Sequence, residues 1–138
     1  MSIPLWLRRE VTVRAGRRCE YCLLAQAGQE AAFHVDHIHP VAEGGETVTG
    51  NLALACVSCS LRKGARLRAR DPQTGREAAL FHPRAHRWNG HFAWKGNRVA
   101  GITPTGRATV DMLKMNRALI VAIRAEERLH GRHPHESE

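Results

Sequence analysis

The stretch FHVDHIHPVAEGGETVTGNLALACVSCSLRKG, residues 33–64, decides the fold of this chain. It opens with a short apolar run that ends in Asp36 and His37, passes through a loop containing two adjacent glycines, and reaches Asn51 before a second apolar run. A Cys-x-x-Cys pair follows at once. Short apolar runs bounded by turn-forming residues are typical of strands, so this pattern predicts a strand, a long loop and a second strand.

The limits of these elements follow from the residues around them. The first strand is expected at Phe33–Ile38, because Pro40 cannot continue a ladder of backbone hydrogen bonds. The second is expected at Asn51–Ala55. From Cys56 to about Arg70 the sequence predicts a helix with a thin apolar side and a strongly cationic one.

Four cysteines stand in two Cys-x-x-Cys pairs, Cys19 with Cys22 and Cys56 with Cys59. Each pair can place two thiolates on one Zn²⁺, and four thiolates complete a tetrahedral site with no open position. The metal is therefore expected to be structural, replacing part of the core that a small domain lacks. The alternative is four free buried cysteines, whereas a redox role would need only one pair.

The remainder of the chain is predicted to be helical at both ends. A first helix is expected to start with Ser2 as its cap and to stop at Gly16. A hairpin is expected over His91–Ile102, turning at Gly96 and Asn97. Helices are expected from Arg107 to Leu129, with a break at Asn116, which could cap the second helix and leave residues such as Leu119 on the core face.

These elements predict one α+β domain. Its parts are expected as follows: a single domain over 1–138, its zinc-stapled core at 17–70, an irregular segment and β-hairpin at 71–106, C-terminal helices at 107–130 and a disordered tail at 131–138.

The charge of the chain is concentrated in its middle. The 138 residues carry a formal net charge of +8, with a pI of about 10.4. Residues 47–107 hold eleven Lys and Arg against two acidic residues. A nucleic acid is the usual partner of such a surface, although an ordinary basic protein would look similar. No apolar run approaches the roughly 20 residues of a membrane span, so we expect a cytoplasmic protein without a membrane partner.

Residues 17–64 resemble the HNH endonuclease family, the His-Me finger or ββα-metal nucleases, in the form that carries a zinc site of four cysteines. The resemblance rests on seven features in the family's order. They are Cys19-x-x-Cys22, Asp36-His37-Ile38, Pro40, Gly44-Gly45, Asn51-Leu52, Cys56-x-x-Cys59 and Lys63-Gly64.

The resemblance implies a ββα-metal core and a role for each motif residue. His37 would be the general base that activates water, and Asp36 would bind a catalytic Mg²⁺ or Mn²⁺ ion. Asn51 would hold the loop that carries His37. The second ligand of the ion is usually a His or Asn directly after the last Cys. This chain has Ser60 there, whose hydroxyl oxygen would bind the ion with Asp36, directly or through a water. His34, on the Asp36 side of the predicted strand, could assist the metal or contact phosphate, and an uninvolved loop histidine is the other interpretation.

The expected function is therefore hydrolysis of DNA phosphodiester bonds. A catalytically decayed, zinc-dependent nucleic-acid-binding module is the alternative that Ser60 leaves open, and a protein-binding adaptor is a third. The predicted contacts with the DNA phosphate backbone are the cations of the expected helix: Arg62, Lys63, Arg66, Arg68 and Arg70.

Overall fold

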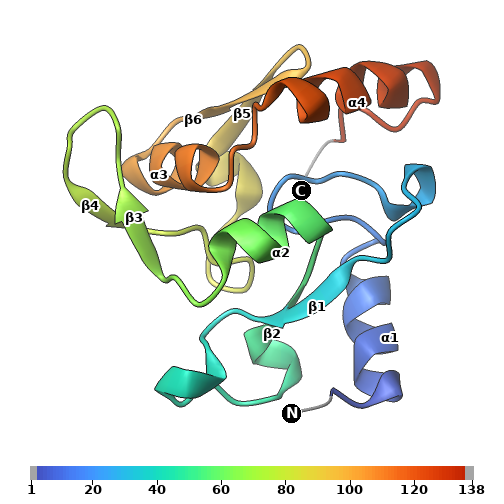
Figure 1. Ribbon diagram of the computed structural model, residues 1–138, viewed down its shortest axis with the longest axis vertical. Helices are drawn as coiled ribbons and strands as arrows, with labels where there is room; N and C mark the ends of the chain where they lie inside the picture. Colours follow the sequence, from blue (N-terminus) through green and yellow to red (C-terminus); the bar gives the residue numbers. More distant parts are fainter. Residues whose placement is uncertain (1–2, 136–138) are drawn as a thin grey trace. The chain divides into compact units, whose positions relative to one another are not determined.

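The computed structural model describes residues 3–135, and the chain forms two compact units, Met1–Ala65 and Arg66–Glu138. Helices are mixed with three two-stranded antiparallel sheets (Figure 1), so the predicted α+β class is confirmed. In the described part of the chain, no helix has the length and apolar character that crossing a membrane needs. The expectation of one domain stays a prediction.

The first unit begins with helix α1 (Leu5–Arg14), which follows Pro4. Gly16 adopts a positive φ of 64° just beyond the helix, as expected of a residue that stops one. The predicted cap, Ser2, lies outside the described residues. Leu7 and Val11 are the buried residues of α1 and provide its contribution to the core.

Strands β1 (His34–His37) and β2 (Leu52–Ala55) pair in antiparallel fashion, with His34 opposite Ala55 and His37 opposite Leu52. Both lie within the predicted ranges. Val35 packs with α1 in the core, together with Leu52 and Leu54. Because successive side chains of a strand point to opposite faces, His34 and Asp36 lie on the face away from that core.

Helix α2 (Val57–Lys63) follows β2 directly (Figure 1). The predicted extension of this helix to Arg70 is wrong. Gly64 ends it with a φ of +53°, and Arg68–Arg70 is strand β3. The physical reason is visible in the burial of β3, where Ala69 is buried between two exposed arginines, an alternation of period two rather than a helical stripe.

In the second unit, β3 pairs with β4 (Glu77–Ala79). A turn after Arg70 connects them, and Asp71 organises it by accepting hydrogen bonds from the Gln73 amide and the Thr74 hydroxyl, each at 3.0 Å. Asp71 also receives two hydrogen bonds of 3.0 Å from the Arg107 guanidinium. The hairpin is thereby tied to the next helix.

The predicted hairpin at His91–Ile102 is confirmed as β5 (Phe92–Lys95) and β6 (Arg98–Gly101), with Lys95 opposite Arg98. Gly96 in the turn has a φ of +62°. Aromatic rings form the core here: the Phe92 ring lies 5.2 Å from Phe81 and 5.0 Å from Trp88, centroid to centroid. Phe92 is buried, so its ring packs in this core and is not available to stack on a ligand.

Helices α3 (Pro104–Met112) and α4 (Ala118–Leu129) confirm the predicted helical region and its break. The predicted cap is wrong. Arg117 occupies the cap position, while the Asn116 amide bonds both the N–H (2.8 Å) and the carbonyl (2.7 Å) of Val99 in β6. Leu119 is also not a core residue, since 66% of it is exposed, whereas Ile120 is buried.

Residues 131–135 lie outside the helices and strands but make specific contacts, and the predicted disorder of the tail stays a prediction. Arg132 pairs with the buried Glu127 at 2.7 Å. The His133 ring bonds the Gly96 carbonyl at 2.9 Å, and Trp94 donates its indole N–H to the His135 carbonyl at 2.9 Å. These contacts hold the segment against the β5–β6 hairpin. The rest of the predicted tail, 136–138, lies outside the described residues.

Candidate functional site

The four cysteines are brought together as the sequence predicts. Cys19, Cys22, Cys56 and Cys59 are all buried, and their sulfur atoms lie within 4.8 Å of one another. The Cys22 and Cys56 sulfurs are 3.8 Å apart. Four thiolates at Zn–S distances of about 2.3 Å around a tetrahedral ion would be about 3.8 Å from each other. The cluster is therefore compatible with a zinc site of four thiolates.

The surroundings of the sulfurs favour a bound cation. In each pair the second cysteine donates its amide to the first sulfur, at 3.5 Å for Cys22 and 3.4 Å for Cys59. Burial raises the pKa of Cys19, and neighbouring thiols together with burial raise the pKa of Cys59. Several negative thiolates could not share this space without positive charge, and a divalent ion supplies it.

The cysteine cluster is connected directly to the strands. Glu20, inside the first pair, donates its amide to the Leu54 carbonyl at 2.8 Å and accepts the Leu54 amide on its carboxylate at 2.9 Å. Arg14 donates to the carbonyls of Thr49 (2.9 Å) and Leu52 (2.7 Å). Fixing the sulfurs in space consequently fixes the outer edge of β2, while Arg14 of α1 holds the start of the strand.

Asn51 holds the loop between the two strands. Its side-chain oxygen accepts the His39 amide at 2.9 Å, and its side-chain nitrogen donates to the carbonyls of His39 (3.0 Å) and Glu46 (2.9 Å). Gly45 closes the same loop, since a Cβ atom there would collide with the His39 carbonyl. These contacts set the path of the chain two residues beyond His37.

The His37 ring is held by a hydroxyl that sequence reasoning missed. The His37 Nε2 atom lies 2.8 Å from the Thr47 Oγ1 atom. Thr47 belongs to the glycine-containing loop, ten residues further along the chain, and nothing in the local sequence distinguishes it from other loop threonines. The contact orients the imidazole.

Asp36 and Ser60 are placed on the same side of the β1–β2 hairpin. Among residues 3–135, no hydrogen bond or ion pair engages the Asp36 carboxylate. The Ser60 Oγ atom lies 2.8 Å from the His34 Nδ1 atom. Because Ser60 is on α2, this contact shows that α2 covers the strand face that carries His34 and Asp36.

The helix predicted to carry this row of cations is shorter than expected, because α2 ends at Lys63 and only Arg62 and Lys63 lie on it. Phosphate binding by these cations stays a prediction. Lys63 is only 3% exposed, and its ammonium donates to the Ile38 carbonyl at 3.1 Å. Burial lowers the pKa of Lys63, and the charge of Asp36 opposes that shift. Lys63 therefore supports the backbone next to His37 instead of facing solvent. The other predicted contacts, Arg62, Arg66, Arg68 and Arg70, are exposed.

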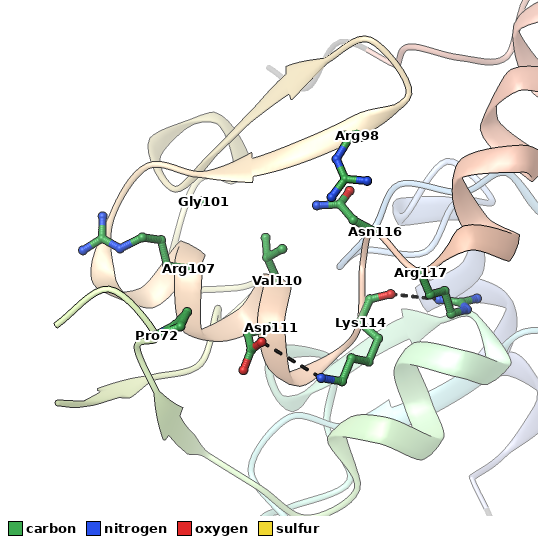
Figure 2. Close-up of a pocket in the computed structure, with 9 residues that line it drawn as sticks. All are labelled: Pro72, Arg98, Gly101, Arg107, Val110, Asp111, Lys114, Asn116 and Arg117. Atoms are coloured by element: carbon green, nitrogen blue, oxygen red, sulfur yellow. Dashed lines mark hydrogen bonds and ion pairs between the residues drawn. The ribbon is translucent and has the colours of Figure 1, made fainter. Parts of the chain in front are cut away.

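The second unit has a cationic hollow that the sequence does not reveal (Figure 2). Its volume is about 420 Å³, and it lies between β6, α3 and the α3–α4 connection. Lys114 pairs with Asp111 at 4.0 Å, and Arg117 donates to the Lys114 carbonyl at 3.3 Å. The lining is more basic than acidic. The lining residues are Pro72, Arg98, Gly101, Arg107, Val110, Asp111, Lys114, Asn116 and Arg117.

Residues 19–66 match the family model described as HNH endonuclease. The matched segment spans both cysteine pairs, β1, β2, α2 and the loop held by Asn51, so the predicted resemblance is confirmed. HNH proteins are generally nucleases. Among curated proteins and among solved structures, nothing matches the chain.

Proposed function

We propose that this protein is a metal-dependent endonuclease that hydrolyses DNA phosphodiester bonds. The observation that carries the proposal is the clamp formed by Asn51, which bonds both backbone groups of His39 inside the segment that matches HNH endonucleases. This clamp fixes the backbone two residues beyond His37. A fixed backbone keeps the His37 imidazole in one position, as a catalytic group requires. β1, β2 and α2 would then form the ββα-metal core of the family.

His37 would act as the general base. An imidazole ionises close to neutral pH and can take a proton from an attacking water. Thr47 fixes the ring through Nε2, which leaves Nδ1 for that proton. Asn51 and Lys63 hold the backbone on the C-terminal side of His37, because they bond His39 and the Ile38 carbonyl respectively.

A divalent ion, Mg²⁺ or Mn²⁺, would be held beside His37 by Asp36. The free carboxylate of Asp36 fits such an ion, because hard cations prefer oxygen ligands. When bound, the ion would polarise the scissile phosphate and stabilise the leaving 3′-oxygen. Ser60 offers a hydroxyl on the same strand face, already in contact with His34. The ion of the cysteine cluster would be structural, since four thiolates leave no open position.

DNA would be bound mainly through its phosphates. Arg62 in the first unit and Arg66, Arg68 and Arg70 in the second are exposed cations, and the hollow shown in Figure 2 adds Arg98 and Arg117. Binding through phosphates is independent of sequence and weakens as salt rises. Lys63 is not part of this proposal, because it is buried.

Nicking of supercoiled plasmid DNA by the zinc-loaded protein, with added Mg²⁺ or Mn²⁺, tests the proposal. Replacing His37 with Ala is expected to lower the nicking rate by about 10² to 10⁴-fold, the usual contribution of a general base. His39→Ala is the matched control, because it removes a ring two residues beyond His37 while the His39 backbone groups that Asn51 holds remain, and it should leave most of the activity. Zinc content of each variant verifies that it is folded.

A second candidate function is a nucleic-acid-binding module without cleavage. The observation that favours it is the Ser60 hydroxyl, which replaces the usual His or Asn ligand and is engaged by His34. That function predicts salt-sensitive DNA binding by the wild-type protein and no nicking that His37→Ala removes. The same result would overturn the proposed endonuclease.

A further inference from the structure

Three side chains share the face of the β1–β2 hairpin that α2 covers. His34 and Asp36 are two residues apart on β1, so their side chains leave the same face with a spacing of about 7 Å. Ser60, on α2, reaches this face and lies 2.8 Å from His34 Nδ1. An ion about 2.1 Å from each ligand could be reached by both the carboxylate and the imidazole.

The Ser60 contact selects which ring nitrogen of His34 is available. A hydroxyl can accept a hydrogen bond from Nδ1–H, and the neutral ring then has its lone pair on Nε2. Histidines that bind metals almost always donate their other N–H to a nearby acceptor, which fixes both the tautomer and the ring orientation. The 2.8 Å contact between His34 Nδ1 and the Ser60 hydroxyl fits this arrangement.

Ser60 itself is the weaker candidate for a ligand. Its hydroxyl is neutral, and one of its interactions is already made with the His34 ring. An imidazole is a stronger donor to first-row transition metals than a hydroxyl, whereas Mg²⁺ prefers oxygen ligands alone. Asp36 with His34 would therefore form a mixed nitrogen and oxygen site.

We infer that His34 supplies the second protein ligand of the catalytic ion through Nε2, together with Asp36, while Ser60 positions the His34 ring. Ser60, which directly follows the last cysteine, is thus a positioning residue in this chain. The metal ligand usually found at that position is replaced by His34 of β1. Because of the imidazole, the site should bind Mn²⁺ more tightly than Mg²⁺. This inference rests on the proposed function, since it concerns the same ion.

The test measures Mn²⁺ binding to the zinc-loaded protein without DNA, by loss of the electron paramagnetic resonance signal of free Mn²⁺. The wild type should bind one Mn²⁺ per chain in addition to its zinc. His34→Ala should weaken this binding by about 100-fold or more, and Ser60→Ala by about 10-fold, as expected for the loss of a partner that orients a ligand. Ser58→Ala, on the same helix as Ser60, should leave the affinity unchanged.

A double variant sharpens the test. His34→Ala combined with Ser60→His returns a histidine to the position after Cys59 and should recover most of the Mn²⁺ affinity. His34→Phe keeps the volume of the ring without its nitrogens, so it replaces His34→Ala if that variant loses zinc or does not fold. Mg²⁺ should compete with Mn²⁺ only weakly in the wild type.

The outcomes separate the inference from the proposed function. If Asp36→Ala abolishes Mn²⁺ binding while His34→Ala and His34→Phe retain it, the inference about His34 is wrong and the proposed endonuclease stands. If Ser60→Ala abolishes binding and His34→Ala does not, Ser60 is the ligand and the inference is again wrong. If the wild type binds no second ion, both proposals fail.

Discussion

The two units of the chain are similar in size but are stabilised in different ways. The first unit, Met1–Ala65, has a small aliphatic core between α1 and the β1–β2 hairpin, and its long loops are held by four thiols and by the polar clamp at Asn51. The second unit, Arg66–Glu138, has a cluster of aromatic rings and two buried ion pairs that involve Asp71 and Glu127.

This difference indicates that the first unit needs an accurately positioned backbone, whereas the second unit needs only a stable fold. A unit of about 65 residues buries too little surface to be secure by packing alone, and a metal is a common substitute. In the first unit the cysteine cluster lies beside the strands that carry Asp36 and His37. In the second unit, no four-thiol cluster exists among the described residues, and the packing of aromatic rings stabilises the unit instead.

The largest expected effect comes from removing one zinc ligand. Cys56→Ser should lower the metal content from about one zinc per chain to nearly none and unfold the first unit. The reason is that structural zinc contributes an apparent binding free energy of about 10–16 kcal/mol, comparable with the whole stability of a domain. Metal analysis together with limited proteolysis measures both effects, with new cleavage sites expected before Ala65.

Ser58→Ala is the matched control for Cys56→Ser. It changes a neighbouring residue of α2 whose hydroxyl accepts only an exposed hydrogen bond from Arg62 at 3.1 Å. It should retain zinc and resist the protease as the wild type does. If Cys56→Ser also keeps its zinc and its resistance, the first unit does not depend on the metal and the contrast between the units is lost.

A smaller effect, confined to the second unit, is expected from Asp71→Asn. Asp71 is fully buried and accepts two hydrogen bonds from Arg107, so the variant leaves a guanidinium without its anion. The Tm of the second unit should fall by about 15 °C or more. Asp111→Asn is the control, because its exposed carboxylate pairs with Lys114 at 4.0 Å and should matter little.

The ion pair between Asp71 and Arg107 makes the stability of the second unit depend on pH in the acidic range. The Arg107 guanidinium holds the pKa of Asp71 well below its usual range. A carboxyl whose pKa is lowered by folding stabilises the protein above its unfolded pKa, about 4, and that stability is lost as pH falls below it. Thermal unfolding between pH 5 and 2 should show a steeper loss for the wild type than for Asp71→Asn; parallel curves would contradict this assignment.

The smallest of these effects is expected from Asn116→Ala. The Asn116 amide satisfies the N–H and the carbonyl of Val99, and their loss should cost about 1–3 kcal/mol in the free energy of unfolding. Asn116→Asp keeps the acceptor but sets a carboxylate oxygen against the Val99 carbonyl, so it should cost at least as much as the alanine. Denaturant unfolding measures both, and equal stability of all three proteins would show that the connection between α3 and α4 does not need this anchor.

Much of the first unit could be predicted because its signals are local. Two Cys-x-x-Cys pairs specify a tetrahedral cluster whatever lies between them, and Asp36, His37 and Asn51 have the family's order. The partners of those residues could not be predicted. Thr47 contacts His37, and His34 contacts Ser60, only after the chain has folded. A single hydroxyl or ring also produces no periodic pattern in the sequence from which its partner could be predicted.

The end of α2 shows a different limit. Residues 64–70 contain alternating arginines and small apolar residues, which suit a cationic helix or a short strand equally well. The decision depends on Glu77–Ala79, a partner strand beyond the next turn, and on the Arg107 contact with Asp71. Asn116 was expected to cap α4 for the same kind of reason, because its actual partner, Val99, lies in a distant strand.

The most direct test of the account is hydrogen exchange measured residue by residue before and after zinc is removed with a chelator. Amides of β1, β2 and the 38–51 loop should lose their protection when zinc is removed, because the cysteine cluster holds the strands that carry Asp36 and His37. Amides of β5, β6 and α4 should keep theirs. Unchanged protection in the first unit, or equal loss in both units, would contradict the claim that a metal clamp shapes the candidate site.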